Sequence, residues 1–148
     1  MALMDSLVGK TINSLSVSDD QGILAFDTDA GVIAYETWSD CCSTTWFADI
    51  TGVDCLLGHS VTKAEDIHFE RCPDDNYLRA EIVRSEPPQD DRCRDMRDEF
   101  HGERLTTVRG YIDIIYRNSS NGYYGGDAEE MTTAPSSNMT PIIADWSA

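Results

Sequence analysis

Positively charged residues are scarce in this chain, in which 11 Lys and Arg stand against 27 Asp and Glu and the formal net charge is −16. Broad binding to DNA or to an anionic membrane needs positive charge, so the composition argues against both functions. It allows the opposite role, an acidic surface offered to a basic partner. Solubility alone also accounts for such a charge, and both interpretations stay open.

The few basic residues are unevenly placed. Residues 1–70 contain two Lys, no Arg and twelve acids, whereas residues 71–117 contain all nine Arg, and residues 118–148 contain four acids and no base. Guanidinium groups suit phosphate and carboxylate, so an anionic ligand would be held in the segment that carries the Arg. The alternative is that these Arg residues pair with their many acidic neighbours.

Long apolar runs are also missing. No stretch approaches the roughly 20 apolar residues of a membrane-spanning helix, and residues 1–10 have neither the basic start nor the apolar run of a signal peptide. The Cys residues are odd in number and cannot all pair, so we expect a protein of the reducing cytoplasm with free thiols. They are Cys41, Cys42, Cys55, Cys72 and Cys93.

Sequence signatures of catalysis and of metal binding are lacking as well. Cys41 and Cys42 are adjacent and point in different directions, and no second pair provides a zinc spacing. A small hydrolase that uses Asp40, Cys42 or His59 is the enzymatic alternative, but acidic neighbours disfavour a thiolate. We therefore expect buried structural Cys, no metal, no cofactor and no catalytic residue.

Alternating apolar residues predict an antiparallel sheet. Clusters of turn-forming residues separate the first three strands, and a bulge near Ser14 explains why the first strand departs from strict alternation. Val108-Arg109-Gly110 closes a later hairpin. The predicted strands are residues 11–17, 23–28, 32–38, 61–70, 77–84, 104–108 and 111–117.

Short helices complete the predicted fold. Asp40 or Ser43 could cap a helix that places Trp46, Phe47 and Ile50 on one apolar side. The stretches before Gly9 and before Gly58 each predict a helical turn, at residues 2–8 and 53–57.

The predicted architecture is α+β, with short helices packed on one face of an antiparallel sheet. One globular domain is expected over residues 1–126. Residues 127–148 are acidic, rich in Ser, Thr and Pro and without periodicity, so they are expected to form a tail. The end of this tail, residues 141–146, is apolar enough to dock on a neighbouring molecule or on its own domain.

The strongest candidate for a binding surface is the segment Arg117–Gly126, which reads RNSSNGYYGG. Asn and Gly adopt backbone angles that other residues avoid, and two adjacent Tyr offer stacking faces with hydroxyl groups. Glycine amides and Arg117 could cradle an anion while a Tyr stacks on a base; the alternative is a tight connection whose Tyr pack on the sheet. The candidate ligand- or partner-binding residues are Arg109, Arg117, Asn118, Asn121, Tyr123, Tyr124, Trp46 and Asp40.

Three pieces of sequence together carry a resemblance: Gly9-Lys10, DCCS at 40–43 followed by Trp46-Phe47, and the segment 117–126. Over about residues 7–126 the chain resembles a family of small uncharacterised proteins seen mostly in phages and prophages. The resemblance implies a phage accessory protein that acts in the cytoplasm of an infected bacterial cell. Such proteins are often inhibitors or sequestering proteins, and the family carries no activity to transfer.

We therefore expect a non-enzymatic accessory protein of the anti-defence type. The preferred hypothesis is an acidic inhibitor that contacts a basic surface of a host defence protein. The alternative is a sponge for a phosphorylated nucleotide signal, held by Arg117 or Arg109 and stacked on Tyr123 or Tyr124. Neither hypothesis involves direct contact with nucleic acid or membrane, and assembly into a homo-oligomer stays open.

Overall fold

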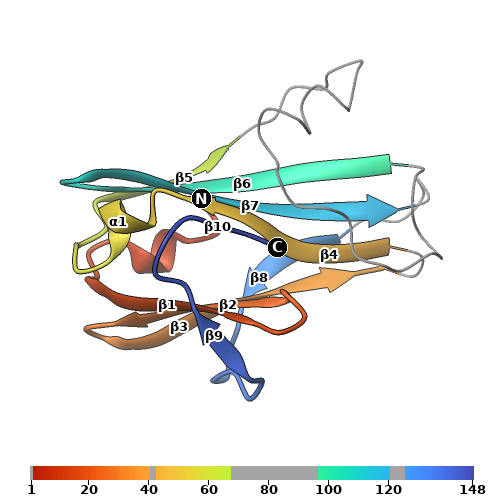
Figure 1. Cartoon of the computed structure of the whole chain (residues 1–148), viewed down its shortest axis with the longest axis horizontal. Helices are drawn as coiled ribbons and strands as arrows, with labels where there is room; N and C mark the ends of the chain where they lie inside the picture. The colour runs from red at the N-terminus through yellow and green to blue at the C-terminus, as the bar shows by residue number, and fades with distance from the viewer. Residues whose placement is uncertain (1, 41–42, 68–96, 121–125) are drawn as a thin grey trace.

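The chain folds as a β-sandwich. The computed structural model describes residues 2–40, 43–67, 97–120 and 126–148. Strands in these residues form two five-stranded antiparallel sheets, a first sheet in the order β8-β3-β2-β1-β9 and a second in the order β10-β4-β7-β6-β5. The two sheets lie face to face (Figure 1). The predicted α+β fold is therefore wrong, because a second sheet covers the face on which helices were expected.

The first sheet is built on the predicted three-stranded meander. Consecutive strands β1, β2 and β3 pair antiparallel, and the register of β1 against β2 shifts between Ile12 and Ser14, where the bulge was predicted. Both predictions are confirmed. The strands of this sheet are β1 (Ile12–Ser18), β2 (Ile23–Thr28), β3 (Gly31–Ser39), β8 (Gly126–Glu130) and β9 (Met139–Pro141).

The second sheet contains the predicted hairpin, formed by β6 and β7 around Gly110, which has a φ of 141°. The predicted helix near Trp46 is wrong, since this segment is β4 and pairs along β7. Phe47 faces the core between the sheets, whereas Trp46 joins a separate cluster on the other face. The strands of this sheet are β4 (Ser43–Thr51), β5 (Lys63–Ile67), β6 (Arg97–Thr107), β7 (Gly110–Ser120) and β10 (Trp146–Ser147).

Helical structure in the described residues is limited to two short elements, η1 (Asp5–Leu7) and α1 (Val53–Leu56), at the two predicted helical turns. Leu7, Val53 and Leu56 are buried in the core between the sheets. Both elements thus close the sandwich at its margins. Within the described ranges, no helix has the length and apolarity that crossing a membrane requires.

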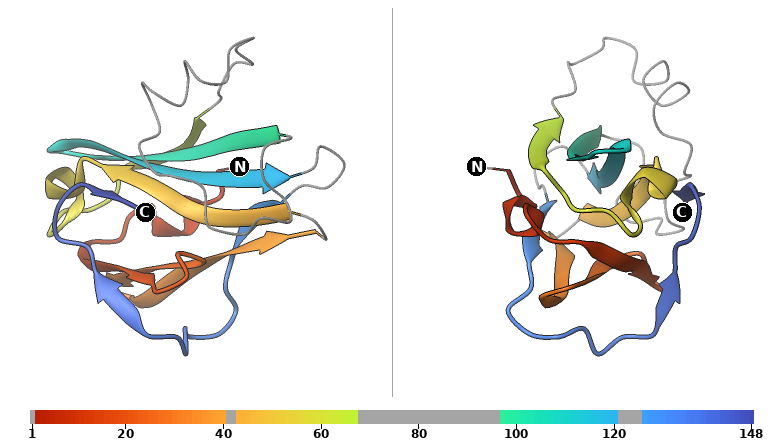
Figure 2. Two further views of the ribbon diagram at one scale, coloured as in Figure 1. Left: turned by 45° about the vertical axis from the view of Figure 1, so that its right-hand side comes forward. Right: turned by 90° about the vertical axis from the view of Figure 1, so that its left-hand side faces the viewer.

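Residues 127–148, expected to form a tail, are integrated into both sheets. β8 pairs with β3, β9 pairs with β1 and β10 pairs with β4. Between β8 and β9 the chain crosses the outer face of the first sheet, and after β9 it continues to the second sheet (Figure 2). Ile142 is 3% exposed in the core, and Asp145 Oδ1 accepts bonds from the N–H of Gly52 and Val53 at 2.8 and 3.2 Å. The apolar end therefore docks on its own domain.

Candidate functional site

Arg117 and Trp46, two of the predicted binding residues, are brought together by the pairing of β7 with β4. Arg117 is fully buried, with its guanidinium carbon 5.0 Å from the Trp46 ring centre and 5.2 Å from that of Phe100. Trp46 itself is only 2% exposed. A cation held between two aromatic rings in this way stabilises the outer face of the second sheet. It is not presented to an anion arriving from solvent.

Asn118 also has a structural role. Its side chain is fully buried, and Nδ2 donates to Thr45 Oγ1 at 2.9 Å. Gly126 packs against the same two groups, and a Cβ at this position would overlap Thr45 Oγ1 and lie 2.7 Å from Asn118 Nδ2. Asn118 of β7 and Gly126 of β8 therefore both pack against Thr45 of β4, and these contacts hold the three strands together.

The remaining predicted residues do not converge on one site. Arg109 is exposed in the β6–β7 turn, and Asp40 is exposed after β3. Seven positions of β7 separate Arg109 from Arg117, which at about 3.3 Å per residue is more than about 20 Å. A single nucleotide cannot contact both side chains. Asn121, Tyr123 and Tyr124 lie outside the described residues.

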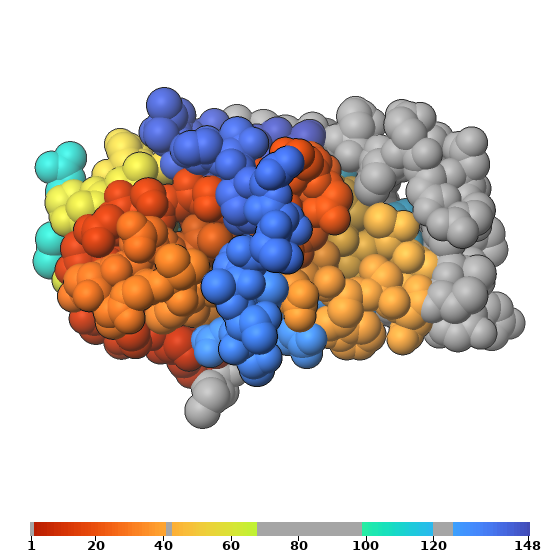
Figure 3. Space-filling view, turned by 90° about the horizontal axis from the view of Figure 1, so that it is seen from below, coloured from red at the N-terminus to blue at the C-terminus, as the bar shows by residue number. Residues whose placement is uncertain are grey.

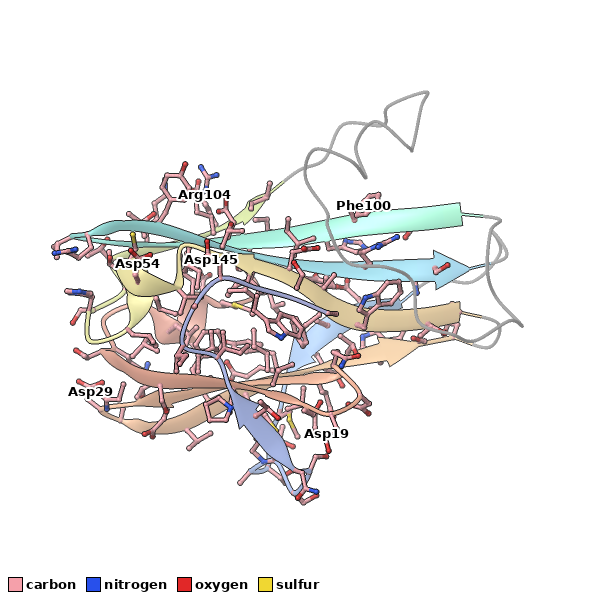
Figure 4. All side chains as sticks on the ribbon, viewed as in Figure 1. Asp19, Asp29, Asp54, Phe100, Arg104 and Asp145 are labelled. Atoms are coloured by element: carbon pink, nitrogen blue, oxygen red, sulfur yellow. The ribbon has the colours of Figure 1, made fainter. Side chains whose placement is uncertain are left out.

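The first sheet has charge of one sign. Residues 11–62 and 118–148, which supply all its strands, contain no Lys and no Arg. The Lys and Arg that lie in described strands belong to the second sheet, where Arg104 binds Asp113 with Nε 2.7 Å from Oδ1. Figure 4 shows Arg104 on the second sheet and the exposed acids Asp19 and Asp29 on the first. The uneven charge along the chain has become an uneven charge between the two sheets.

An exposed tryptophan lies in this acidic sheet. Side chains alternate along a strand, so Glu36 and Trp38 share the outer face of β3 while Tyr35 points into the core. Trp38 is 44% exposed, and Glu129 on β8 is the direct partner of Glu36. We call Glu36, Trp38 and Glu129 the Trp38 patch.

The turn between β1 and β2 adds charge beside the Trp38 patch. Thr37 N–H donates to the Gly22 carbonyl at 2.8 Å, which holds the turn against β3. Hydrogen bonds from the Ser18 hydroxyl and the Gly22 N–H hold the pKa of Asp20 below its usual range, so this carboxylate stays ionised. Figure 3 shows the face of the first sheet from below, with the connection from β8 to β9 crossing it.

A cleft of about 340 Å³ opens between the sheets, where the edge strands β5 and β8 come close. Its walls include Asp66 of β5, Asp127 of β8 and the stacked rings of His101 and Tyr116. The ring centroids lie 5.0 Å apart with an interplanar angle of 14°. The Tyr116 hydroxyl donates to Asp127 Oδ1 at 2.7 Å. Burial, together with this hydrogen bond, raises the pKa of Tyr116.

One wall residue of this cleft, Asp66, belongs to a pair of carboxyl groups. Glu103 is 1% exposed and is the direct cross-strand partner of Asp66. Burial, followed by the hydrogen bond with Asp66, raises the pKa of Glu103 to about 8, although its Oε1 accepts the Met4 N–H at 2.9 Å. Two hydrogen-bonded carboxylates cannot both ionise cheaply, so Glu103 keeps at neutral pH the proton that it shares with Asp66.

Comparison with known proteins identifies a family. A family model described as a domain of unknown function, DUF7448, matches residues 5–129. The chain belongs to the DUF7448 family. No curated protein and no solved structure matches it.

The DUF7448 region contains the strands β1 to β7 and most of β8. It therefore includes the whole Trp38 patch and both carboxyl groups of the Glu103–Asp66 pair. Strands β9 and β10 lie beyond the matched residues, although they complete the two sheets of this DUF7448 protein.

Sequence reasoning missed both the Trp38 patch and the cleft. The patch had a local signal, because Glu36 and Trp38 are two positions apart at the end of a predicted strand and so share one face. The cleft had none, since its walls come from β5, β6, β7 and β8 and depend on how the two sheets are packed.

Proposed function

We propose that this DUF7448 protein acts by binding rather than by catalysis, and that its Trp38 patch docks on a basic surface of a partner protein. The observation that carries the proposal is an exposed Trp beside a like-charged pair, on a sheet whose strands contain no Lys or Arg. Trp side chains are enriched among the residues that dominate binding energy at protein interfaces. Acidic groups around such an anchor select a basic partner and speed the encounter.

The charges of the Trp38 patch offer little to the fold itself. Like charges directly opposite each other on neighbouring strands are destabilising, and Glu36 and Glu129 have this relation. No strand of the first sheet has a Lys or Arg to offset them. A basic surface on a partner would supply the counter-charge that the strands of the first sheet lack, and this gives Glu36 and Glu129 a role in binding.

The kind of partner follows from the sequence resemblance. Because the chain resembles accessory proteins of phages, we propose that the partner is a host defence protein and that binding inhibits it. The nucleotide sponge is less favoured, since Arg117 is fully buried between Trp46 and Phe100. Capture of a phosphorylated ligand would require this guanidinium to leave both rings.

In the test, the wild-type full chain and its variants are each immobilised and then exposed to bacterial lysate at low salt. A retained protein is identified by mass spectrometry, purified and titrated against each variant. Trp38→Ala should weaken binding by about 30-fold, the usual minimum for a hot-spot residue. The double variant Glu36→Gln/Glu129→Gln should also bind less tightly, because it keeps the shape of the patch and removes its charge.

Asp27 and Val32 provide a matched control. They are cross-strand partners on the same outer face, and Val32 is 56% exposed. Six positions of β3, or about 20 Å, separate Val32 from Trp38. Asp27→Asn/Val32→Ala should leave the affinity unchanged. The proposal is wrong if no protein is retained at low salt, or if the control weakens binding as much as Trp38→Ala does.

A further inference from the structure

Trp38 lies near the end of β3, where this strand extends past β2. The pairing of β2 with β3 ends at Glu36, whereas the pairing of β8 with β3 continues to Ser39. Among the described residues, Trp38 is therefore paired with a strand of the first sheet on one side only. A strand end with a single partner opens more easily than the middle of a sheet. An exposed anchor at such a place needs a further attachment if it is to stay in one arrangement.

Thr45 of β4 provides this attachment. β4 belongs to the second sheet and begins beside the end of β3 (Figure 1). The Thr45 hydroxyl donates to the Trp38 carbonyl at 2.9 Å, and the Thr45 carbonyl accepts the Thr37 hydroxyl at 3.0 Å. The Ser39 hydroxyl donates to Thr45 Oγ1 at 2.9 Å. Three consecutive residues of β3 are thus bonded to one residue of the opposite sheet.

The bonds of the Thr45 hydroxyl use its whole hydrogen-bonding capacity. A hydroxyl group has one proton to donate and two acceptor positions. Ser39 Oγ and Asn118 Nδ2 both donate to Thr45 Oγ1 at 2.9 Å, so the Thr45 proton is directed to the Trp38 carbonyl. Thr45 is 7% exposed and Asn118 is fully buried, so water has little access to replace these bonds. The orientation of the hydroxyl towards Trp38 is therefore fixed by its neighbours.

We propose that Thr45 is the positioning residue of the Trp38 patch, and that it holds the end of β3 so that the Trp38 ring is presented to the partner in one arrangement. This inference rests on the proposed docking function. Ordering a mobile side chain on binding lowers affinity, and a side chain that is already fixed avoids this loss. Removal of the Thr45 hydroxyl should therefore weaken binding about two- to tenfold, although Thr45 is buried and Trp38 is unchanged.

The experiment is fluorine NMR of the full chain labelled with fluorotryptophan, which needs no partner. The chain contains three Trp, and the Trp38 resonance is the one that disappears in Trp38→Phe. Thr45→Val keeps the shape of the side chain and removes its hydroxyl, so the Trp38 resonance should move towards its position in the unfolded chain. Thr45→Ser restores the hydroxyl and should return the resonance to its wild-type position. Ser39→Ala, at an exposed residue, removes one bond of Thr45 and should move the resonance in the same direction by less.

Thr107→Val is the matched control. Thr107 is also a buried Thr of the second sheet, and its hydroxyl also donates to a backbone carbonyl, that of Cys55 at 2.6 Å. It lies at the turn of the β6–β7 hairpin, at the end of β7 opposite to Thr45. Thr107→Val should lower the melting temperature and leave the Trp38 resonance unchanged, because only a bond at the end of β3 orders Trp38.

The affinity for the purified partner is then measured for the same variants. Thr45→Val should bind about two- to tenfold more weakly than the wild type, and Thr107→Val should bind as the wild type does. The proposal is wrong if neither Thr45→Val nor Ser39→Ala moves the Trp38 resonance, if Thr107→Val moves it equally, or if Thr45→Val binds with wild-type affinity. The docking function fails separately, when no partner is retained or when Trp38→Ala binds normally, and the resonance still shows whether Thr45 orders Trp38.

Discussion

Replacing Glu103 with Gln should stabilise the protein, and the gain should grow with pH. Glu103 is 1% exposed, and its pKa of about 8 lies well above the ordinary value of 4.5. Below about pH 4.5 both the folded and the unfolded chain hold this proton, so the group contributes nothing to the pH dependence of stability. Between pH 4.5 and pH 8 the unfolded chain releases the proton while the folded chain retains it, and the free energy of unfolding falls.

The size of the effect follows from the difference between the two pKa values. Each pKa unit corresponds to about 1.4 kcal/mol, so the ionisable side chain lowers the free energy of unfolding by at most about 5 kcal/mol at pH 8. Gln cannot ionise, but its oxygen can still accept the Met4 N–H and its amide can still donate to Asp66. Glu103→Gln should therefore match the wild type near pH 4.5 and exceed it by several kcal/mol near pH 8.

The assay is urea unfolding of both proteins at a series of pH values from about 4.5 to about 8.5. Glu65→Gln serves as the control, because its side chain is 43% exposed and lies on the neighbouring strand β5. This variant should show no gain that grows toward pH 8. A difference between Glu103→Gln and the wild type that stays constant across this range would refute the reasoning about the buried carboxyl pair.

Three further predictions, one of them with a control substitution, test how the C-terminal residues complete the sandwich. Ile142→Ala should lower the free energy of unfolding by about 2–5 kcal/mol in urea. Ile143 is 81% exposed, so Ile143→Ala should change this free energy by less than about 0.5 kcal/mol. Similar values for the two variants would argue against docking of the C-terminal residues on the core. Gly126→Ala should lower the melting temperature, because a Cβ would overlap Thr45 Oγ1 and overpacking costs about 1–3 kcal/mol; an unchanged melting temperature would contradict this close packing. Asp145→Ala should cost about 1 kcal/mol by removing the acceptor at the start of α1; a stability equal to the wild type would exclude this cap.

Elements with a clear local pattern could be predicted from the sequence. The β1–β2–β3 meander and the β6–β7 hairpin are formed by consecutive segments joined by turn-forming residues. Strand β4 was mistaken for a helix because both its faces are covered, Phe47 on one and Trp46 on the other. Two-sided burial removes the alternation that distinguishes a strand from an apolar helix.

Elements that depend on distant pairing could not be predicted. Strands β9 and β10 have three and two residues, and only their partners β1 and β4 define them. The same limit applies to the candidate site. Arg117 lies on the predicted strand, β7. Whether its guanidinium contacts solvent or two aromatic rings depends on Trp46 of β4 and Phe100 of β6, which only the pairing of the strands brings beside it.

The most direct test of the proposed docking surface is the salt dependence of binding to the purified partner. The dissociation constant is measured for the wild type and for Glu36→Gln/Glu129→Gln from about 50 to about 500 mM sodium chloride, a range over which screening of exposed charges increases strongly. Wild-type affinity should fall steeply with salt, and the double variant should bind more weakly with a shallower slope. Equal affinities and equal slopes for the two proteins would contradict the claim that the Trp38 patch contacts a basic surface.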